Sequence, residues 1–286
     1  MVNGEAEPFV VGSKSFTAVA INTAAKAGQW IKTKLGDINR VDTKFSSQDL
    51  VTEVDKGSEK LIRNLILTHF PDHSILGEEG VAPGPEASAK ALQAMSDEEY
   101  LWIVDPIDGT TNFVHGFPFY SVSIALAHRG EVIVGVVYDP TRDELFVAEK
   151  GKGAYRHGKK TEVSLEDQLS LSLVATGFPA DRQGALVTNL KGVQALSPKV
   201  RNLRVAGSAA LHLAYVAAGR LSGFWEIGLN SWDIAAGALL IQESGGQVTD
   251  TEGKPYNLAV RNVMATNGKI HAELGQELAA AEATGF

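Results

Sequence analysis

The sequence contains no cysteine, and this absence excludes several kinds of chemistry. Without a thiol the chain forms no disulfide, no thiolate zinc site and no cysteine nucleophile. Long apolar runs are also missing, because no segment approaches the roughly 20 consecutive apolar residues that span a bilayer. Residues 1–14 lack a basic stretch followed by an apolar one, so no export signal is expected. We therefore expect a soluble, cytoplasmic protein that does not bind membranes.

Basic residues are in the minority, with 26 Lys and Arg against 34 Asp and Glu, for a formal charge of −8. A nucleic-acid surface needs clustered Lys and Arg, so no nucleic-acid partner is expected. An acidic protein that acts on a phosphate needs local cations, which bound metal ions would supply. At 286 residues and 44% hydrophobic content, the chain is long enough to bury a sizeable core.

The segment 105–112, Asp-Pro-Ile-Asp-Gly-Thr-Thr-Asn, is the most informative one in the chain. It follows the apolar stretch Leu101–Val104, which predicts a buried strand, and Pro106 should end the ladder. Gly109 allows a turn whose amide groups can point at an anion. Two aspartates and this turn suit a metal ion that holds a phosphate. The alternative is an ordinary turn, because Pro, Asp and Gly are common turn formers.

Two further acidic segments complete a pattern, Gly-Glu-Glu-Gly at 77–80 and Trp-Asp-Ile-Ala-Ala-Gly at 232–237. Together with 105–112 they resemble the inositol monophosphatase family. The resemblance extends over nearly the whole chain, through Lys44, 49–55, 207–210 and Gly245-Gly246. The segments 175–179, 207–219 and 224–228 resemble the bacterial branch more than the animal one.

The resemblance implies an α/β fold, a five-layer αβαβα sandwich, as a single domain over 1–286 with intimately packed halves at about 1–150 and 151–286. Periodicity predicts helices at 15–35, 55–70, 209–218 and 234–243. It predicts strands at 75–76, 101–104, 122–127, 132–138, 145–148, 173–176, 223–227, 247–249 and 263–265. The third to fifth of these should form an antiparallel meander. The segment 81–99, rich in Ala, Pro, Gly and Ser, is expected to be a surface insertion with a short exposed helix.

The acidic residues are expected to bind metal. The resemblance implies one ion on Glu78, Asp105 and the carbonyl of Ile107, and a second on Asp105, Asp108 and Asp233, with a third held weakly near Glu78. Ligands that are all oxygen favour Mg²⁺ over Zn²⁺. Two carboxylates about 4 Å apart repel by roughly 4 kcal/mol at an effective dielectric near 20, and bound metal removes this cost.

The resemblance also assigns catalytic roles. A water molecule is the expected nucleophile, with Thr110 contacting it, Asp55 accepting from Thr110, and Glu79 acting as a further base. The amides of Gly109 and Thr110 would hold the phosphate at a helix N-terminus.

Each of these acidic residues has a simpler structural interpretation. Asp55 could be only the N-cap of the following helix, and Asp233 could cap its helix while also binding metal. Glu78 could be a solvated charge at a strand end. Lys44 could be either a surface lysine or a neighbour of the metal loop, where its family counterpart lies.

Substrate selection is expected at Glu226, which matches a family carboxylate that accepts a hydrogen bond from a substrate hydroxyl. The segment Gly207, Ser208 and Ala209 would lie against the polyol ring, and Asp108 would also bind substrate. The alternative for Glu226 is a surface ion pair. Animal family members have a histidine two positions before the Trp-Asp motif, where this chain has Asn230. Asparagine can still hydrogen-bond a hydroxyl, but the substrate preference is then less defined.

Other conspicuous residues near the motif are expected to have structural roles. His115 and His128 have no ligand spacing and should lie in loops or pack. The aromatic residues beside the strands are expected in the core, namely Trp102, Phe117, Phe119 and Phe224.

The sequence thus predicts a Mg²⁺-dependent phosphatase, with two or three ions per subunit, for myo-inositol monophosphate or a related polyol phosphate. Alternatives are a relative that acts on fructose 1,6-bisphosphate, histidinol phosphate or 3′-phosphoadenosine 5′-phosphate, and a non-catalytic regulatory protein on the same scaffold. The resemblance further implies a homodimer and inhibition by lithium.

Overall fold

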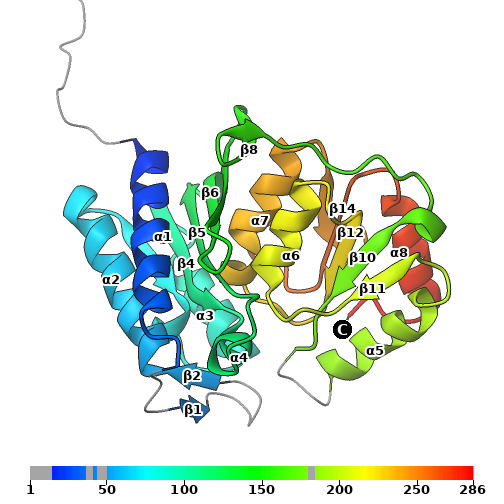
Figure 1. Cartoon of the computed structure of the whole chain (residues 1–286), viewed down its shortest axis with the longest axis horizontal. Coiled ribbons are helices and arrows are strands. Elements are labelled where there is room, and N and C mark those ends of the chain that lie inside the picture. The colour runs from blue at the N-terminus through cyan, green and yellow to red at the C-terminus, as the bar shows by residue number, and fades with distance from the viewer. Residues whose placement is uncertain (1–14, 37–40, 44–49, 180–183, 286) are drawn as a thin grey trace, which may run out of the picture.

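A computed structural model describes residues 15–36, 41–43, 50–179 and 184–285 (Figure 1). Its helices are α1 (Phe16–Lys32), α2 (Glu53–His69), α3 (Pro85–Ala94), α4 (Thr110–Val114), α5 (Ala185–Leu196), α6 (Ala209–Ala217), α7 (Ser231–Glu243) and α8 (His271–Ala280), with short 3₁₀ turns η1 (Glu78–Gly80) and η2 (Leu169–Leu171). Its strands are β1 (Val41–Thr43), β2 (Leu50–Thr52), β3 (Ser74–Gly77), β4 (Tyr100–Asp108), β5 (Ser121–His128), β6 (Glu131–Asp139), β7 (Glu144–Glu149), β8 (Gly153–Arg156), β9 (Lys159–Lys160), β10 (Leu173–Thr176), β11 (Asn202–Arg204), β12 (Gly223–Glu226), β13 (Gln247–Asp250) and β14 (Val263–Thr266).

The two large sheets and three helix layers form the expected five-layer αβαβα sandwich (Figure 1). One sheet has the order β3-β4-β5-β6-β7-β8-β9, and the other has the order β11-β10-β12-β14-β13. Helices α1 and α2 cover the outer face of the first sheet, while α5 and α8 cover the outer face of the second. Helices α6 and α7 lie between the sheets and contact both. Within the described ranges, no helix is both long and apolar enough to cross a membrane.

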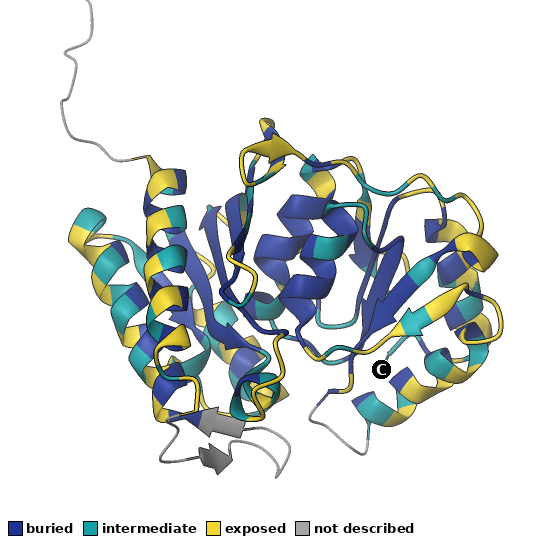
Figure 2. Cartoon of the chain, in the orientation of Figure 1, coloured by how far each residue is buried: buried dark blue, intermediate teal, exposed yellow. Residues whose placement is uncertain are grey.

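The central helices are apolar on nearly every side because both sheets cover them, and Figure 2 shows them almost wholly buried. Close contacts in this layer require glycine. A Cβ atom on Gly237 in α7 would overlap Leu213 of α6. A Cβ atom on Gly135 in β6 would lie 2.7 Å from the carbonyl oxygen of Ala236. The absence of these two side chains therefore sets how closely α7 approaches its neighbours.

The predicted helices and strands are confirmed, with differences mainly at their ends. Pro106 does not end β4, which runs on to Asp108. The ladder with β5 instead shifts register between Asp105 and Asp108, so a bulge accommodates the proline that lacks an N–H group. The segment 81–99 does form a short helix, α3, although Leu92 and Met95 pack against the core.

Several elements carried no recognisable signal, namely α5, α8, β1, β2, β8, β9 and β11. The aromatic prediction was right for Trp102, Phe119 and Phe224, which are buried, and wrong for Phe117, which is 52% exposed in the loop after α4. His128 has a packing role, since its ring stacks on Tyr100 with centroids 4.7 Å apart. His115 is exposed at the end of α4.

Candidate active site

The end of β4 places two aspartates on the same side of the sheet. In a regular strand, residues three positions apart point to opposite faces. Leu101 and Ile103 face the central helices, and the alternation continues to Asp105. The bulge then shifts the pattern by one residue, so that Ile107 packs on the outer face and Asp108 points inward. The irregularity at the proline is therefore what brings the two carboxylates together.

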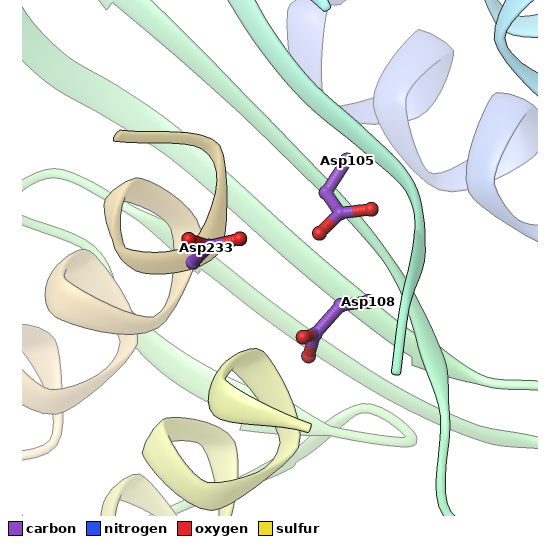
Figure 3. Close-up of side chains that lie close together, drawn as sticks. All are labelled: Asp105, Asp108 and Asp233. Atoms are coloured by element: carbon purple, nitrogen blue, oxygen red, sulfur yellow. The ribbon is translucent and has the colours of Figure 1, made fainter. Parts of the chain in front are cut away.

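A third aspartate comes from the first turn of α7, more than 120 residues further along the chain. One carboxylate oxygen from each of Asp105, Asp108 and Asp233 lies within 4.8 Å of the others, as Figure 3 shows. Asp233 is held by the backbone N–H of Asn230, which donates to its Oδ2 at 2.7 Å. Asp105 is held by the N–H of Ile107, which donates to its Oδ1 at 2.9 Å.

Asp108 is fixed against the start of α6. The N–H groups of Ala209 and Ala210 donate to its two oxygens at 3.2 and 2.8 Å, and the hydroxyl of Ser208 also donates to it. These bonds connect the segment expected to contact substrate with one of the expected metal ligands. The segment itself is anchored to the 105–112 motif, because the side-chain amide of Asn112 donates to the carbonyl of Ala206 at 2.6 Å.

The clustered carboxylates are electrostatically strained. Burial raises the pKa of Asp108 to about 6, and the negative charge of Glu78 adds to the shift. Burial and the charges of Glu78 and Asp108 raise the pKa of Asp233 well above its usual value. Bound cations would relieve this repulsion. The donors are all oxygens, so the residues fit a hard divalent cation of the Mg²⁺ kind.

Glu78 lies on the turn η1, and its effect on the pKa of two aspartates places it near the cluster. Glu59 of α2 secures this turn, because its Oε2 accepts the N–H of Glu79 at 2.7 Å. Its other oxygen accepts the Nε–H of Arg63 at 2.8 Å. Gly77 packs directly on the same carboxylate and leaves no room for a side chain. Sequence reasoning missed Glu59, although it follows Asp55 by four positions on the same helix face.

Asp55 joins α2 to the β4–α4 corner. Its Oδ1 accepts the hydroxyl of Thr110 at 2.9 Å, and its Oδ2 accepts the N–H and the hydroxyl of Thr52 at 2.8 and 2.6 Å. Thr52 is the N-cap of α2 and Asp55 occupies the third helical position. The N-cap interpretation of Asp55 was therefore wrong, although its side chain does cap the helix by reaching back. Asp233 likewise follows the N-cap Asn230 instead of being the cap itself.

Glu226 ends β12 and is only 6% exposed. Burial raises its pKa well above the usual value, with further contributions from Asp233 and Asp108. Gly177 lies against its carboxylate with no room for a Cβ atom. The carbonyl of Gly177 accepts the side-chain amide of Asn189 at 2.6 Å. The alternative of a surface ion pair is wrong, since Glu226 is buried beside the acidic cluster.

The corner after β4 begins with Gly109, whose φ of +98° favours glycine. A side chain there would also lie 3.0 Å from the carbonyl oxygen of Gly207. The carbonyl of Ile107 accepts the hydroxyl of Thr110 at 3.1 Å, so the corner and the Asp55 contact form one network. Lys44 lies outside the described residues.

The structure thus brings together the carboxylates of Asp105, Asp108 and Asp233 and the Thr110–Asp55 pair. Ser208 and Ala209 contact Asp108, and Glu78 and Glu226 lie near enough for charge to act between them and the cluster. Glu59, Asn112 and Asn189 are added in supporting roles.

Comparisons with known proteins agree with this geometry. A family model described as "Inositol monophosphatase family" matches residues 13–283. Inositol monophosphatase 2 from Solanum lycopersicum is 46% identical over 90% of this chain and 95% of its own. Fructose-1,6-bisphosphatase/inositol-1-monophosphatase from Thermotoga maritima is 38% identical over 89% of this chain and 92% of its own. A solved structure of an IMPase from Thermotoga maritima, 36% identical, superposes with a TM-score of 0.82 over 92% of this chain and 96% of its own.

Proposed function

The chain belongs to the inositol monophosphatase family, and from this premise we propose that it is a Mg²⁺-dependent phosphatase for myo-inositol monophosphate or a closely related polyol phosphate. Family membership makes it a phosphoric monoester hydrolase of a metal-dependent family. The observation that carries the finer proposal is the convergence of Asp105, Asp108 and Asp233 beside the Thr110–Asp55 pair. These residues come from separate elements and meet only in the folded chain.

Two or three Mg²⁺ ions per subunit would be held by the carboxylates of Glu78, Asp105, Asp108 and Asp233, with the carbonyl of Ile107. When bound, such ions neutralise charge on the phosphoryl group and make a water molecule more acidic. The raised pKa values of Asp108 and Asp233 support this assignment, because each carboxylate keeps its charge more easily beside a cation.

The chain's own residues would orient the attacking water and receive its proton. The Thr110 hydroxyl donates to Asp55, so its oxygen is available to accept a hydrogen bond from a water molecule. Proton transfer along this pair towards Asp55 leaves the water a better nucleophile, with Glu79 as a further base. The amides of Gly109 and Thr110 at the start of α4 would hold the phosphate.

Glu226 and the segment Gly207, Ser208 and Ala209 would hold the alcohol part of the substrate. A buried carboxylate is a good acceptor for the vicinal hydroxyls of a polyol. Glu226 lies close enough to Asp233 and Asp108 for their charges to affect its pKa, which supports its place at the same site. We further propose that the protein is a cytoplasmic homodimer.

The rival substrates share the phosphate site and differ only in the alcohol part. The name of the Thermotoga maritima relative covers both fructose 1,6-bisphosphate and inositol 1-phosphate, which keeps the bisphosphate as a second candidate. Histidinol phosphate and 3′-phosphoadenosine 5′-phosphate complete the set. The site favours the polyols, because Glu226 offers an acceptor for hydroxyl groups.

The deciding experiment measures Mg²⁺-dependent phosphate release from these four esters. We expect the highest kcat/KM for inositol 1-phosphate and no turnover after chelation of the metal. A clear preference for another ester would replace the substrate but keep the phosphatase. Absence of turnover on every ester would favour the regulatory alternative.

A further inference from the structure

Both backbone hydrogen-bonding groups of Ala206 are held by side chains from separate helices. Ala206 lies in the connection from β11 to α6, directly before the segment 207–209 that the proposed function places against the alcohol part of the substrate. Its carbonyl accepts the side-chain amide of Asn112 in α4 at 2.6 Å. Its N–H donates to Nε2 of His212 in α6 at 3.3 Å. The position of the chain just before the segment is therefore set from two sides.

Asn112 belongs to the 105–112 motif, yet the proposed function gives it no part in binding metal or phosphate. Its amide nitrogen also donates to the carbonyl of Phe119 at 2.6 Å. Both partners are carbonyl oxygens, which only accept, so the nitrogen end of the amide must face them. Gly207 lies against the same amide, because a Cβ atom there would be 3.1 Å from its nitrogen. Asn112 thus joins the corner after β4 to the connection that leads into α6.

His212 lies in the buried central layer, where its ring contacts those of Phe119 and Phe224 at centroid distances of 5.3 and 5.2 Å. Burial lowers the pKa of His212 to about 3, so the ring is neutral at ordinary pH and one of its nitrogens can accept a hydrogen bond. Because Nε2 accepts from Ala206, the ring proton is on Nδ1, which is buried without a hydrogen-bond partner among the described residues. An unpartnered buried donor destabilises the fold. The useful contribution of this histidine is therefore its acceptor at Nε2.

The segment 207–209 is also held at its far end. The hydroxyl of Ser208 and the N–H of Ala210 donate to the carboxylate of Asp108, which is fixed on β4. With the chain held before and after it, the segment has little freedom to adapt its shape to a ligand. A rigid surface rejects a ligand of the wrong shape more strongly than one that can rearrange, because rearrangement would recover lost contacts.

We propose that Asn112 and His212 are positioning residues that set how strictly the site selects the alcohol part of its substrate. The inference rests on the proposed function, which places the segment 207–209 against that part. Both residues act through the backbone of Ala206, and neither is required to touch the substrate. Losing either contact should loosen the segment and weaken the preference for a polyol, while the phosphate end of the site stays in place.

The contact with His212 is tested by hydrogen exchange of the Ala206 amide in the full-length protein, followed by NMR. His212→Leu removes the acceptor and should speed exchange of this amide about tenfold. His212→Gln places an amide oxygen where Nε2 lies, so exchange should stay within about threefold of wild type. Equal exchange in all three proteins would overturn the contact. The measurement needs no activity, so it separates failure of the contact from failure of the proposed function.

The effect on selection is measured as kcat/KM for inositol 1-phosphate divided by kcat/KM for p-nitrophenyl phosphate, an ester without further hydroxyl groups, both at saturating Mg²⁺. A loss of folded enzyme lowers both values equally and leaves the ratio unchanged, whereas a lost positioning contact lowers the ratio. We expect about a tenfold fall for Asn112→Ala, which loses two hydrogen bonds, and about threefold for His212→Leu, with recovery in His212→Gln. Asn64→Ala, the same change at an exposed position of α2, should keep the wild-type ratio.

A double variant shows whether the two residues act together. Asn112→Ala combined with His212→Leu should lower the ratio little more than Asn112→Ala alone, because both changes release the same residue. Additive losses, or an unchanged ratio in Asn112→Ala, would overturn the inference while the phosphatase remains. No turnover of either ester by the wild type would overturn the proposed function, and this inference with it.

Discussion

At the scale of single residues, Asp105 is the member of the acidic cluster with the sharpest predicted role. It forms a triangle with Asp108 and Asp233, and the proposed function makes it a ligand of two ions (Figure 3). We expect Asp105→Asn to lower kcat by at least about a hundredfold while the circular dichroism spectrum stays unchanged. Asp97→Asn, at an exposed position, is the matched control and should behave as wild type. Near wild-type turnover at moderate Mg²⁺ would contradict the proposed role.

Glu226 gives a prediction about pH. Its raised pKa means that the charged form costs free energy only in the folded state. In EDTA, Glu226→Gln should therefore raise Tm at pH 8. The gain should shrink as the pH falls towards 5, because the wild-type carboxyl group then takes up a proton in the folded state and the penalty disappears. If the Tm increase were the same at pH 8 and pH 5, burial would not penalise the charged form of Glu226.

The sequence predicted the site residues that belong to short motifs. Asp105, Asp108 and Thr110 belong to one short segment of the chain, so their types and spacing could be interpreted directly. Glu59 and Asn189 could not be found in this way. Each acts through a backbone group of a distant segment, the N–H of Glu79 and the carbonyl of Gly177, and such contacts exist only after folding.

At the scale of elements, one face of α2 supports two parts of the site. Asp55 holds the β4–α4 corner, and one turn later Glu59 holds the η1 turn. Because Glu59 fixes the segment that carries Glu78, we expect Glu59→Ala to raise the Mg²⁺ concentration for half-maximal activity by about tenfold. The kcat at saturating Mg²⁺ should change little.

Two matched variants separate this positioning from general stability. Glu59→Gln keeps an acceptor for the N–H of Glu79 and should restore most of the metal affinity. Arg63→Ala removes the ion pair but leaves that acceptor in place, so its activation by Mg²⁺ should stay within about twofold of wild type. If Glu59→Ala and Arg63→Ala weakened activation by Mg²⁺ equally, the ion pair, and not the backbone contact, would be what positions Glu78.

Helix α7 gives a second prediction for an element. Gly237→Ala should destabilise the fold by about 1–3 kcal/mol despite the better helix propensity of alanine, because the new methyl group overlaps Leu213. Gly275→Ala is the same change in α8, where the nearest atom is the flexible end of Met264 at 3.2 Å. That variant should be neutral or more stable by up to about 1 kcal/mol. Urea denaturation measures both, and the same sign for both would contradict the packing argument.

Periodicity predicted elements well where one face of each is buried, as in α1 and α2. It failed for the irregular end of β4. The alternation of Leu101, Ile103 and Asp105 would place Asp108 on the opposite face, and only the bulge corrects this. The exposed edge strand β11 and the hairpin β8–β9 are too short to show a pattern. The sequence therefore indicates the layers better than the turns that shape the site.

At the scale of the whole molecule, metal should act as a stabilising ligand. The cluster joins β4 of the first sheet to α7 of the central layer, so a bound ion would connect two layers. We expect Mg²⁺ at about 100 times its Kd to stabilise the fold by about 2.7 kcal/mol relative to EDTA, seen as a Tm increase of several degrees. The increase should be largely lost in Asp105→Asn. Equal increases in both proteins would place the stabilising ions elsewhere.

The central helix layer also affects how the protein is made. The seven-stranded sheet ends at Lys160, whereas the helix that covers its inner face is complete only at Glu243. At typical synthesis rates the ribosome needs on the order of ten seconds to make the residues between them. During that interval an apolar face that includes Ile103 and Val137 has no cover. The nascent chain is thus open to aggregation and to chaperone binding, and a gene cut after the first sheet would yield insoluble protein.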